Sequence, residues 1–253
     1  MNRRRWLAGA AATLGAAFVS ACDRVTGAPV VQQALRMAEG LTRRAQRLIL
    51  PRQALAPTYD RADISPDFRP NGSIDPQASD YLALKAGGFA DYRLVVDGLV
   101  ERPLSLSLAE LRARPTQSQI TKHDCVEGWT SIAEWTGVRL AALLDEAGLK
   151  PQARYIVFHC FDALDQREDG ERYYESIDLI DARHPQTILA WAMNGRTLGV
   201  PHGAPLRLRV ERQIGYKHAK YIRRIEAVDS FAHLGRGQGG YWEDRGYEWY
   251  AGI

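Results

Sequence analysis

Residues 121–129 read TKHDCVEGW, and within them Cys125 lies among polar and charged neighbours at the end of a segment, Ser118 to Asp124, that we expect to be extended. A cysteine that only fills a core more often has apolar neighbours, as Cys160 has in the apolar run from Tyr155 to Phe161. A thiolate at Cys125 could act as a nucleophile or as a soft metal ligand. In an oxidising compartment the two cysteines could instead form a disulfide, and their spacing leaves this open.

Other cofactor motifs are missing or incomplete in the sequence. None of the six histidines has a zinc-like spacing and there is no Cys-x-x-Cys pair, which disfavours zinc. There is also no Cys-x-x-Cys-His motif for a covalently attached c-type haem. The glycines between Gly235 and Gly240 match a dinucleotide pattern, but the thirteen residues after them are too few to complete that unit.

The N-terminus has the pattern of an export signal. Arg3, Arg4 and Arg5 precede an uncharged run from Trp6 to Ala21, which is shorter than the about 20 apolar residues of a membrane span. Residues 2–7 resemble the twin-arginine motif, whose route carries folded proteins, often with a cofactor already loaded. Residues 19–22 also resemble a lipobox, which predicts a lipid anchor at Cys22. The alternatives are ordinary cleavage near Ala21 and an uncleaved N-terminal anchor.

The basic and acidic residues of the whole chain are nearly equal in number, but they are unevenly distributed along the sequence. The 253 residues carry a formal charge of +3, which Arg3 to Arg5 supply, because the other 30 basic residues equal the 30 acidic ones. This balance disfavours a nucleic-acid binder. Between Pro201 and Ile225, however, seven bases accompany one acid, Glu211. Such a concentration suits a phosphate-bearing ligand, and a salt-bridged surface strand is the alternative.

Periodicity and turn signals predict one mixed α+β domain after an N-terminal amphipathic helix over 31–49. Ser107 and Glu110 form a capping box that begins a short helix, and Gly148 ends another helix that contains Leu140 and Leu144. Asn194-Gly195 indicates a hairpin turn. We expect strands over 92–100, 118–124, 155–161 and 206–211, and the last would place Arg207 and Arg209 on one face.

The order of several motifs resembles the sulfite oxidase family of molybdenum enzymes. They are His123, Cys125–Trp129, Trp135-Thr136-Gly137, His184-Pro185, Asn194-Gly195, and His202–Arg207 running into Gly215-Tyr216-Lys217. The likeness extends from about Asp63 to the C-terminus and is greatest to the bacterial periplasmic branch typified by the methionine-sulfoxide reductase catalytic subunit. It implies an α+β, sulfite-oxidase-type molybdopterin-binding fold with mixed β-sheets and flanking helices.

The resemblance also implies roles for individual residues. Cys125 would be the molybdenum ligand and the catalytic residue, which disfavours its disulfide with Cys160. His202 and Cys160 depart from the asparagine and threonine of the methionine-sulfoxide branch, so the substrate does not transfer safely. Arg207 and Lys220 would bind the cofactor phosphate. The cofactor-binding residues implied in this way are Asn71, Cys125, Cys160, His202, Arg207, His218, Ala219 and Lys220.

These observations predict an exported enzyme with a signal peptide over 1–21, an amphipathic helix and linker over 22–62, and a molybdopterin-binding catalytic domain over 63–253. It would lie in the periplasm or on the outer face of the inner membrane. Its expected reaction is two-electron oxygen-atom transfer on a small substrate, such as the reduction of an S-oxide. The alternatives are a sulfite dehydrogenase, a noncatalytic binding domain of the same fold and, less favoured, a cysteine hydrolase.

The expected partners depend on which additional domains the chain carries besides the catalytic core, since members of the sulfite oxidase family often have a haem domain or a dimerisation domain. We expect neither a haem domain before the core nor a dimerisation domain after it, and no haem in this chain. Electrons would then come from a separate electron-transfer partner, such as a membrane haem protein, and the arginine-bearing helix is a candidate docking surface. The substrate would be a small molecule and no nucleic acid would bind. The aromatic residues over 241–250 would pack over the core or shape substrate access.

Overall fold

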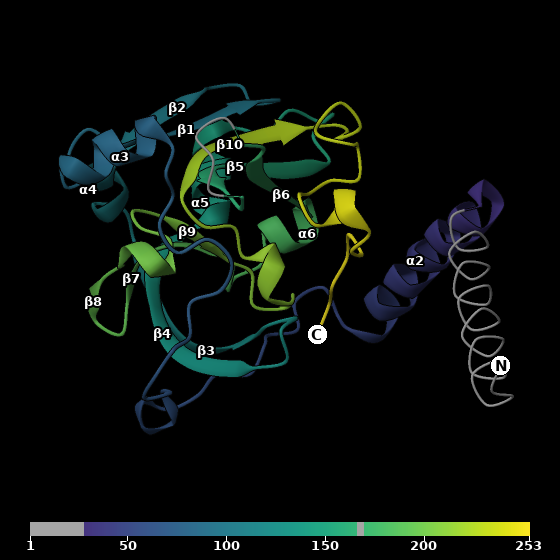
Figure 1. Cartoon of the computed structure of the whole chain (residues 1–253), viewed down its shortest axis with the longest axis horizontal. Helices are drawn as coiled ribbons and strands as arrows, with labels where there is room; N and C mark the ends of the chain where they lie inside the picture. The colour runs from purple at the N-terminus through teal and green to yellow at the C-terminus, as the bar shows by residue number, and fades with distance from the viewer. Residues whose placement is uncertain (1–27, 166–169) are drawn as a thin grey trace, which may run out of the picture. The chain divides into compact units, whose positions relative to one another are not determined.

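The computed structural model describes residues 28–165 and 170–253, so the twin-arginine and lipobox residues lie outside the described part (Figure 1). The chain divides into a first unit that ends at Leu50 and a second unit from Pro51 to Ile253. The first unit contains the helix α2, Pro29–Ile49, which confirms the amphipathic helix expected there. Pro29 stands in the first turn, where its missing N–H costs no helical hydrogen bond. Of the described helices, none has both the length and the apolar character needed to span a membrane.

The first sheet of the second unit is mixed. Its strand order is β2-β1-β10-β5-β6. Strands β1 and β10 are parallel, whereas the other neighbours are antiparallel. The parallel pair brings together segments that are about half the chain apart, and it places β10 in the centre of the sheet. The strands are β1 Arg93–Gly98, β2 Leu104–Ser107, β5 Tyr155–Ala163, β6 Arg172–Asp178 and β10 Ile222–Val228.

The second sheet lies on the opposite side of this unit from β1, β2 and β10 (Figure 1). Its order is β3-β4-β7-β8, and β9 also pairs with β7. Asn194 and Gly195 turn the chain between β7 and β8 with φ of 51° and 73°, so the predicted hairpin is confirmed. The strands are β3 Thr116–Asp124, β4 Thr130–Arg139, β7 Ile188–Met193, β8 Arg196–Thr197 and β9 Arg207–Arg209.

Short helices flank the two sheets, as expected for this fold class. Ser107 and Glu110 form the predicted capping box at the start of α4, and Gly148 ends α5 with a φ of 70°. The α-helices are α3 Ser79–Ala86, α4 Leu108–Arg112, α5 Leu140–Ala147 and α6 Leu179–Ala182. Single turns of 3-10 helix cover Arg61–Asp63, Val200–His202, Gly215–Lys217 and Glu243–Arg245.

The basic strand near residue 208 is buried on both faces. Arg207 and Arg209 are each 0% exposed, and both guanidinium groups stack over the ring of Trp135, at 4.7 and 4.5 Å from its centroid. The two arginines therefore share one face, as the alternation predicted. The alternative of a salt-bridged surface strand is wrong, because β9 is covered by the rest of the second unit.

Candidate functional site

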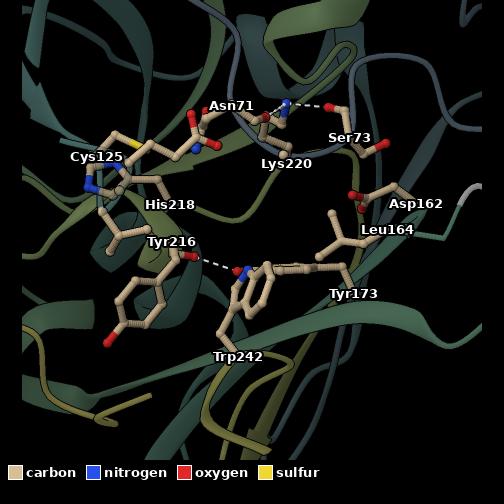
Figure 2. A pocket seen from close by; sticks show the side chains of 14 residues that line it. Asn71, Ser73, Cys125, Asp162, Leu164, Tyr173, Tyr216, His218, Lys220 and Trp242 are labelled. Carbon is tan, nitrogen blue, oxygen red and sulfur yellow. Dashed lines mark hydrogen bonds between the residues drawn. The ribbon is translucent and has the colours of Figure 1, made fainter. Parts of the chain in front are cut away.

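A pocket in the second unit is formed where six segments meet, and Cys125 lies in its wall (Figure 2). Cys125 follows β3 directly and begins the loop to β4. Its N–H donates to the carbonyl of Trp129 at 2.9 Å, and its carbonyl accepts from the N–H of Gly128 at 3.0 Å. Gly128 has a φ of 86°, which closes this short loop. The antiparallel pairing of β3 with β4 thus holds Cys125 at a defined point of the pocket wall.

The environment of Cys125 favours the neutral thiol in the protein alone. The side chain is buried, and this burial raises the pKa of the thiol above its ordinary value. The negative charge of Glu127 raises it further, although backbone N–H groups and Arg69 oppose the shift. A thiol in this state is a poor nucleophile, whereas a bound metal ion would deprotonate it outright. The neutral state of the thiol therefore disfavours the cysteine hydrolase.

Two histidines lie close to this loop with their ring centroids 5.0 Å apart. His123 accepts at Nδ1 from Arg209 Nη1 at 2.9 Å, because an arginine can only donate. His218 donates from Nε2 to the carbonyl of Gln213 at 2.9 Å, so its Nδ1, which has no partner, is an acceptor. Burial first, and nearby cations second, lower the pKa of both imidazoles well below the ordinary value. Both rings are therefore neutral at pH 7.

Gly215 permits the close approach between the loop of His218 and the strand that carries His123. A Cβ atom at Gly215 would lie 2.8 Å from His123 Nε2 and 3.1 Å from the carbonyl oxygen of Asp124. No other residue type fits at that distance. The glycine in the Gly215-Tyr216-Lys217 motif is thus explained by packing against the segment that ends in Cys125.

Lys220 forms the upper wall of the pocket in Figure 2 and ties a loop to it. Its Nζ donates to the carbonyl oxygens of Asn71 at 2.6 Å, Ser73 at 2.5 Å and Pro201 at 3.0 Å. Burial lowers the pKa of Lys220 to about 7, and the neighbouring Arg207 acts in the same direction. Asn71 is brought into the pocket by these bonds. Because they occupy all three N–H groups of the ammonium, a phosphate would have to displace one of them.

Asp162 lies on the side of the pocket opposite Cys125 (Figure 2). It is 3% exposed, its Oδ1 has no hydrogen-bond partner, and burial raises its pKa to about 7. Asp162 was not predicted to be a site residue, although an acid inside the apolar strand β5 was a usable signal. Ser73 and Tyr173 also line the pocket, and no local pattern distinguishes them. Trp242 lines it as well, and it belongs to the aromatic segment over 241–250 that was predicted to pack over the core or shape substrate access.

Arg207 is a buried cation whose charge no carboxylate balances within the described ranges. Its Nη1 donates to the carbonyl of His202 at 2.9 Å, whereas its Nε and Nη2 have no partner. Arg209 differs, because Glu211 accepts from its Nε at 2.9 Å and from its Nη2 at 2.5 Å. Burial, with Arg209 as the second cause, lowers the pKa of Arg207 to about 9. An unmatched, fully buried guanidinium indicates that an anion belongs beside it.

Gly203 permits close packing against the first side-chain atoms of both Arg207 and Lys220, of which Lys220 lines the pocket. The glycine has a φ of 106°, and a Cβ there would lie 2.9 Å from the Cβ of Lys220 and 3.2 Å from that of Arg207. His202, which precedes it, packs edge-on against Phe68 with ring centroids 5.7 Å apart. Phe68 also contacts the ring of His123 at 5.6 Å. Arg207 and His202 therefore flank the pocket, although neither lines its surface as Asn71, Cys125, His218 and Lys220 do.

Cys160 and Ala219, which were also predicted to bind the cofactor, do not line the pocket. Ala219 is 1% exposed in the core, and its carbonyl accepts from the N–H of Leu208 at 2.8 Å. Cys160 is fully buried on β5, and it borders a separate hollow that shares Tyr173 with the pocket. Within the part of the chain that the structure describes, Cys125 and Cys160 are both free thiols. The disulfide alternative is therefore excluded.

The half-buried His202 makes stability depend on pH. Burial lowers the pKa of His202 from 6.5 to about 4, so the unfolded chain takes up a proton that the folded chain does not. We expect the unfolding free energy of the cofactor-free protein to be intact above pH 6.5 and to fall as the pH drops toward about 4. His202→Asn should reduce this slope in urea unfolding, whereas His233→Asn at an exposed position should not. An unchanged slope in His202→Asn would contradict the assignment.

A buried thiol, an unmatched guanidinium and several unpartnered nitrogen atoms around one pocket define a protein that binds an anionic, metal-containing cofactor. The family model described as the oxidoreductase molybdopterin binding domain matches residues 83–233, and the chain belongs to this family. It is a molybdopterin-binding oxidoreductase of the sulfite oxidase type, and the resemblance seen in the sequence is confirmed.

Relatives with assigned names agree with this membership. The chain is 34% identical over 251 residues to a protein of Azospira oryzae that is provisionally named protein-methionine-sulfoxide reductase subunit YedZ1, covering 99% of this chain and 87% of that one. It is 35% identical over 147 residues to the protein-methionine-sulfoxide reductase catalytic subunit MsrP of Gluconobacter oxydans, covering 54% and 47%. The sulfane dehydrogenase SoxCD of Paracoccus pantotrophus superposes with a TM-score of 0.50 at 28% identity, covering 56% of this chain and 39% of that chain.

Proposed function

We propose that this oxidoreductase is exported and performs a two-electron oxygen-atom transfer on a small substrate, the reduction of an S-oxide. One observation carries the proposal: a buried thiol, Cys125, lines the pocket, and a buried guanidinium without a carboxylate partner among the described residues, Arg207, flanks the same pocket. The relatives named as methionine-sulfoxide reductase subunits support an S-oxide as the substrate. The named sulfane dehydrogenase supports the alternative, in which the protein oxidises a sulfur compound such as sulfite.

The residues around the pocket fit the cofactor. A molybdopterin carries a phosphate and a ring system rich in hydrogen-bonding groups. Nε and Nη2 of Arg207 are unpartnered donors suited to the phosphate. Nδ1 of His218 and Oδ1 of Asp162 are unpartnered acceptors suited to N–H groups. Each of these atoms would carry a desolvation penalty without a ligand, so the protein is prepared for a polar, anionic group.

Each side chain then has a defined part in the reaction. The cofactor, when bound, supplies the two-electron redox chemistry. Cys125 would hold the metal as a thiolate, and Arg207 would hold the phosphate. The neutral ring of His218 would accept a hydrogen bond without adding positive charge. Asp162, which lies across the pocket from Cys125, would contact the cofactor and not the substrate (Figure 2). Reduction of an S-oxide to the sulfide and water uses two protons and two electrons.

The reaction is tested by assaying molybdenum and pterin in the purified protein and then offering substrates. We expect both in near-equal molar amounts. The reduced protein should then be reoxidised by methionine sulfoxide faster than the oxidised protein is reduced by sulfite. The opposite order of rates would favour a sulfite dehydrogenase. The absence of molybdenum and pterin from protein made in a competent host would instead favour a noncatalytic binding domain.

Arg207→Ala should weaken cofactor retention by about tenfold to a hundredfold, because the buried phosphate would lose its charged hydrogen-bond partner. Pterin content after dialysis measures this loss without relying on turnover. The matched control is Arg224→Ala, which removes an arginine already paired with Asp97 and Glu226 at the surface of the first sheet. Equal pterin content in the two variants would refute the role of Arg207.

Export and an electron partner complete the proposal. The twin-arginine-like start and the small residues before Cys22 support delivery to the periplasm or to the outer face of the inner membrane. The word subunit in the relatives' names supports a separate electron-transfer partner, for which a membrane haem protein is suited. Fractionation of cells and mass analysis of the mature N-terminus test the route and lipidation of Cys22. A cytoplasmic protein that retains Met1 would overturn export.

A further inference from the structure

Among the described side chains of the helix α2, the large apolar ones on one face are exposed. Val30, Met37, Leu41 and Leu48 are spaced by seven, four and seven residues, which places them above one another on one face of a helix. Their exposed fractions are 72%, 66%, 63% and 87%, and Ile49 is 78% exposed. Scattered apolar side chains are ordinary on a surface, but an apolar stripe of this kind indicates a binding face.

The polar side of the same helix is basic. Residues 29–49 contain four arginines and a single acid, Glu39. The exposed Arg44 lies at the edge of the apolar stripe, where a long side chain can reach from an apolar layer to a polar one. The second unit has the opposite sign, because its acidic residues outnumber its basic ones. Positive charge suited to an anionic surface is therefore concentrated on α2.

We propose that α2 lies flat on an anionic phospholipid bilayer, with the stripe from Val30 to Leu48 in the acyl boundary and its arginines at the headgroups. An amphipathic helix with a basic polar face is the form that binds at this interface, and α2 lacks the apolar character of a spanning helix. Charge complementarity favours lipid over a protein partner. Binding to lipid does not depend on the redox reaction, and only the choice of leaflet rests on the proposed export.

The position of α2 in the chain supports this occupant. Pro29 follows Cys22 by seven residues, and the uncharged run from Trp6 to Ala21 comes directly before that cysteine. Whether that run stays attached or Cys22 carries a lipid, α2 would begin next to the membrane surface. A basic amphipathic helix at that place would add its own binding energy to whichever anchor precedes it.

Vesicle flotation tests the surface with protein that begins at Asp23, which keeps every described residue and removes the lipid site and the apolar run. The protein should float with vesicles of phosphatidylglycerol and phosphatidylcholine and much less with phosphatidylcholine alone. Leu41→Ser with Leu48→Ser should weaken binding more than about tenfold, because two large apolar side chains are lost from the stripe. Arg44→Gln should weaken it about fivefold, an effect that added salt removes.

The matched control is Thr42→Ser with Gln46→Ser, two substitutions to serine outside the stripe, which should change binding less than about twofold, since surface changes have small effects. Equal pterin content in all variants shows that the second unit is intact. Failure of the unaltered protein to bind anionic vesicles would overturn the proposal, as would equal binding by the double leucine variant. Leucine-dependent retention on a detergent-extracted membrane protein, without vesicle binding, would replace the bilayer by a protein partner. Loss of S-oxide reduction alone would leave vesicle binding unchanged.

Discussion

Cys125→Ser is expected to lower turnover by more than about a hundredfold, because even the outer partners of metal ligands cost about tenfold to a hundredfold when they are removed. The hydroxyl is similar in size to the thiol, so the β3–β4 loop should keep its shape. The serine hydroxyl is a harder and far less acidic ligand than the thiol, and it would replace the sulfur that a soft metal site requires. The expected result is a folded protein with little activity and an altered or lost metal centre.

Two measurements separate this loss from a loss of fold. Urea unfolding should give nearly the same midpoint for Cys125→Ser as for the unaltered protein, while molybdenum content and the absorption of the metal–sulfur bonds change. Cys160→Ser makes the same chemical exchange at the other described cysteine and should keep the molybdenum. Full activity in Cys125→Ser would reject the ligand assignment. Loss of metal in both variants would indicate a general effect of removing a buried thiol.

Lys217→Met should reduce the unfolding free energy by about 3–5 kcal/mol, the cost of leaving a buried ion pair without one partner. Lys217 is 0% exposed, and its Nζ donates to Glu243 at 2.5 Å and to Glu175. Burial alone would lower its pKa, but the two carboxylates raise it, so the ammonium is charged. Removing it leaves two acids in a low-dielectric interior. Urea unfolding measures the loss.

The pH dependence distinguishes this electrostatic cause from simple packing. Burial first, and Glu243 second, raise the pKa of Glu175 well above 4.5. A group whose pKa is raised on folding stabilises the folded state below its unfolded pKa, and it does so less as the pH rises. The deficit of Lys217→Met should therefore be larger at neutral pH than near pH 4.5. Adding Glu175→Gln and Glu243→Gln should recover most of it. An equal deficit at both pH values would point to packing.

Local patterns predicted the elements whose determinants are contiguous. The capping box at Ser107 and the stop at Gly148 need only a few adjacent residues, and α4 and α5 form where expected. The alternation around Leu208 placed Arg207 and Arg209 on one face for the same reason. The parallel pairing of β1 with β10 depends on contacts between distant segments, and no local period encodes it. The motifs identified the family because several of them recur in a consistent order.

The residue types around Cys125 were enough to indicate a soft ligand at the end of a strand, since that conclusion needs only the thiol and its neighbours along the chain. The same information could not distinguish Arg207 from Arg209, which stand in one short strand with similar neighbours. Glu211 stands only two residues after Arg209, but the folded chain alone adds His123 to this pair and leaves Arg207, among the described residues, beside the pocket without a carboxylate. The difference arises because charge pairing in an interior depends on which distant segments meet.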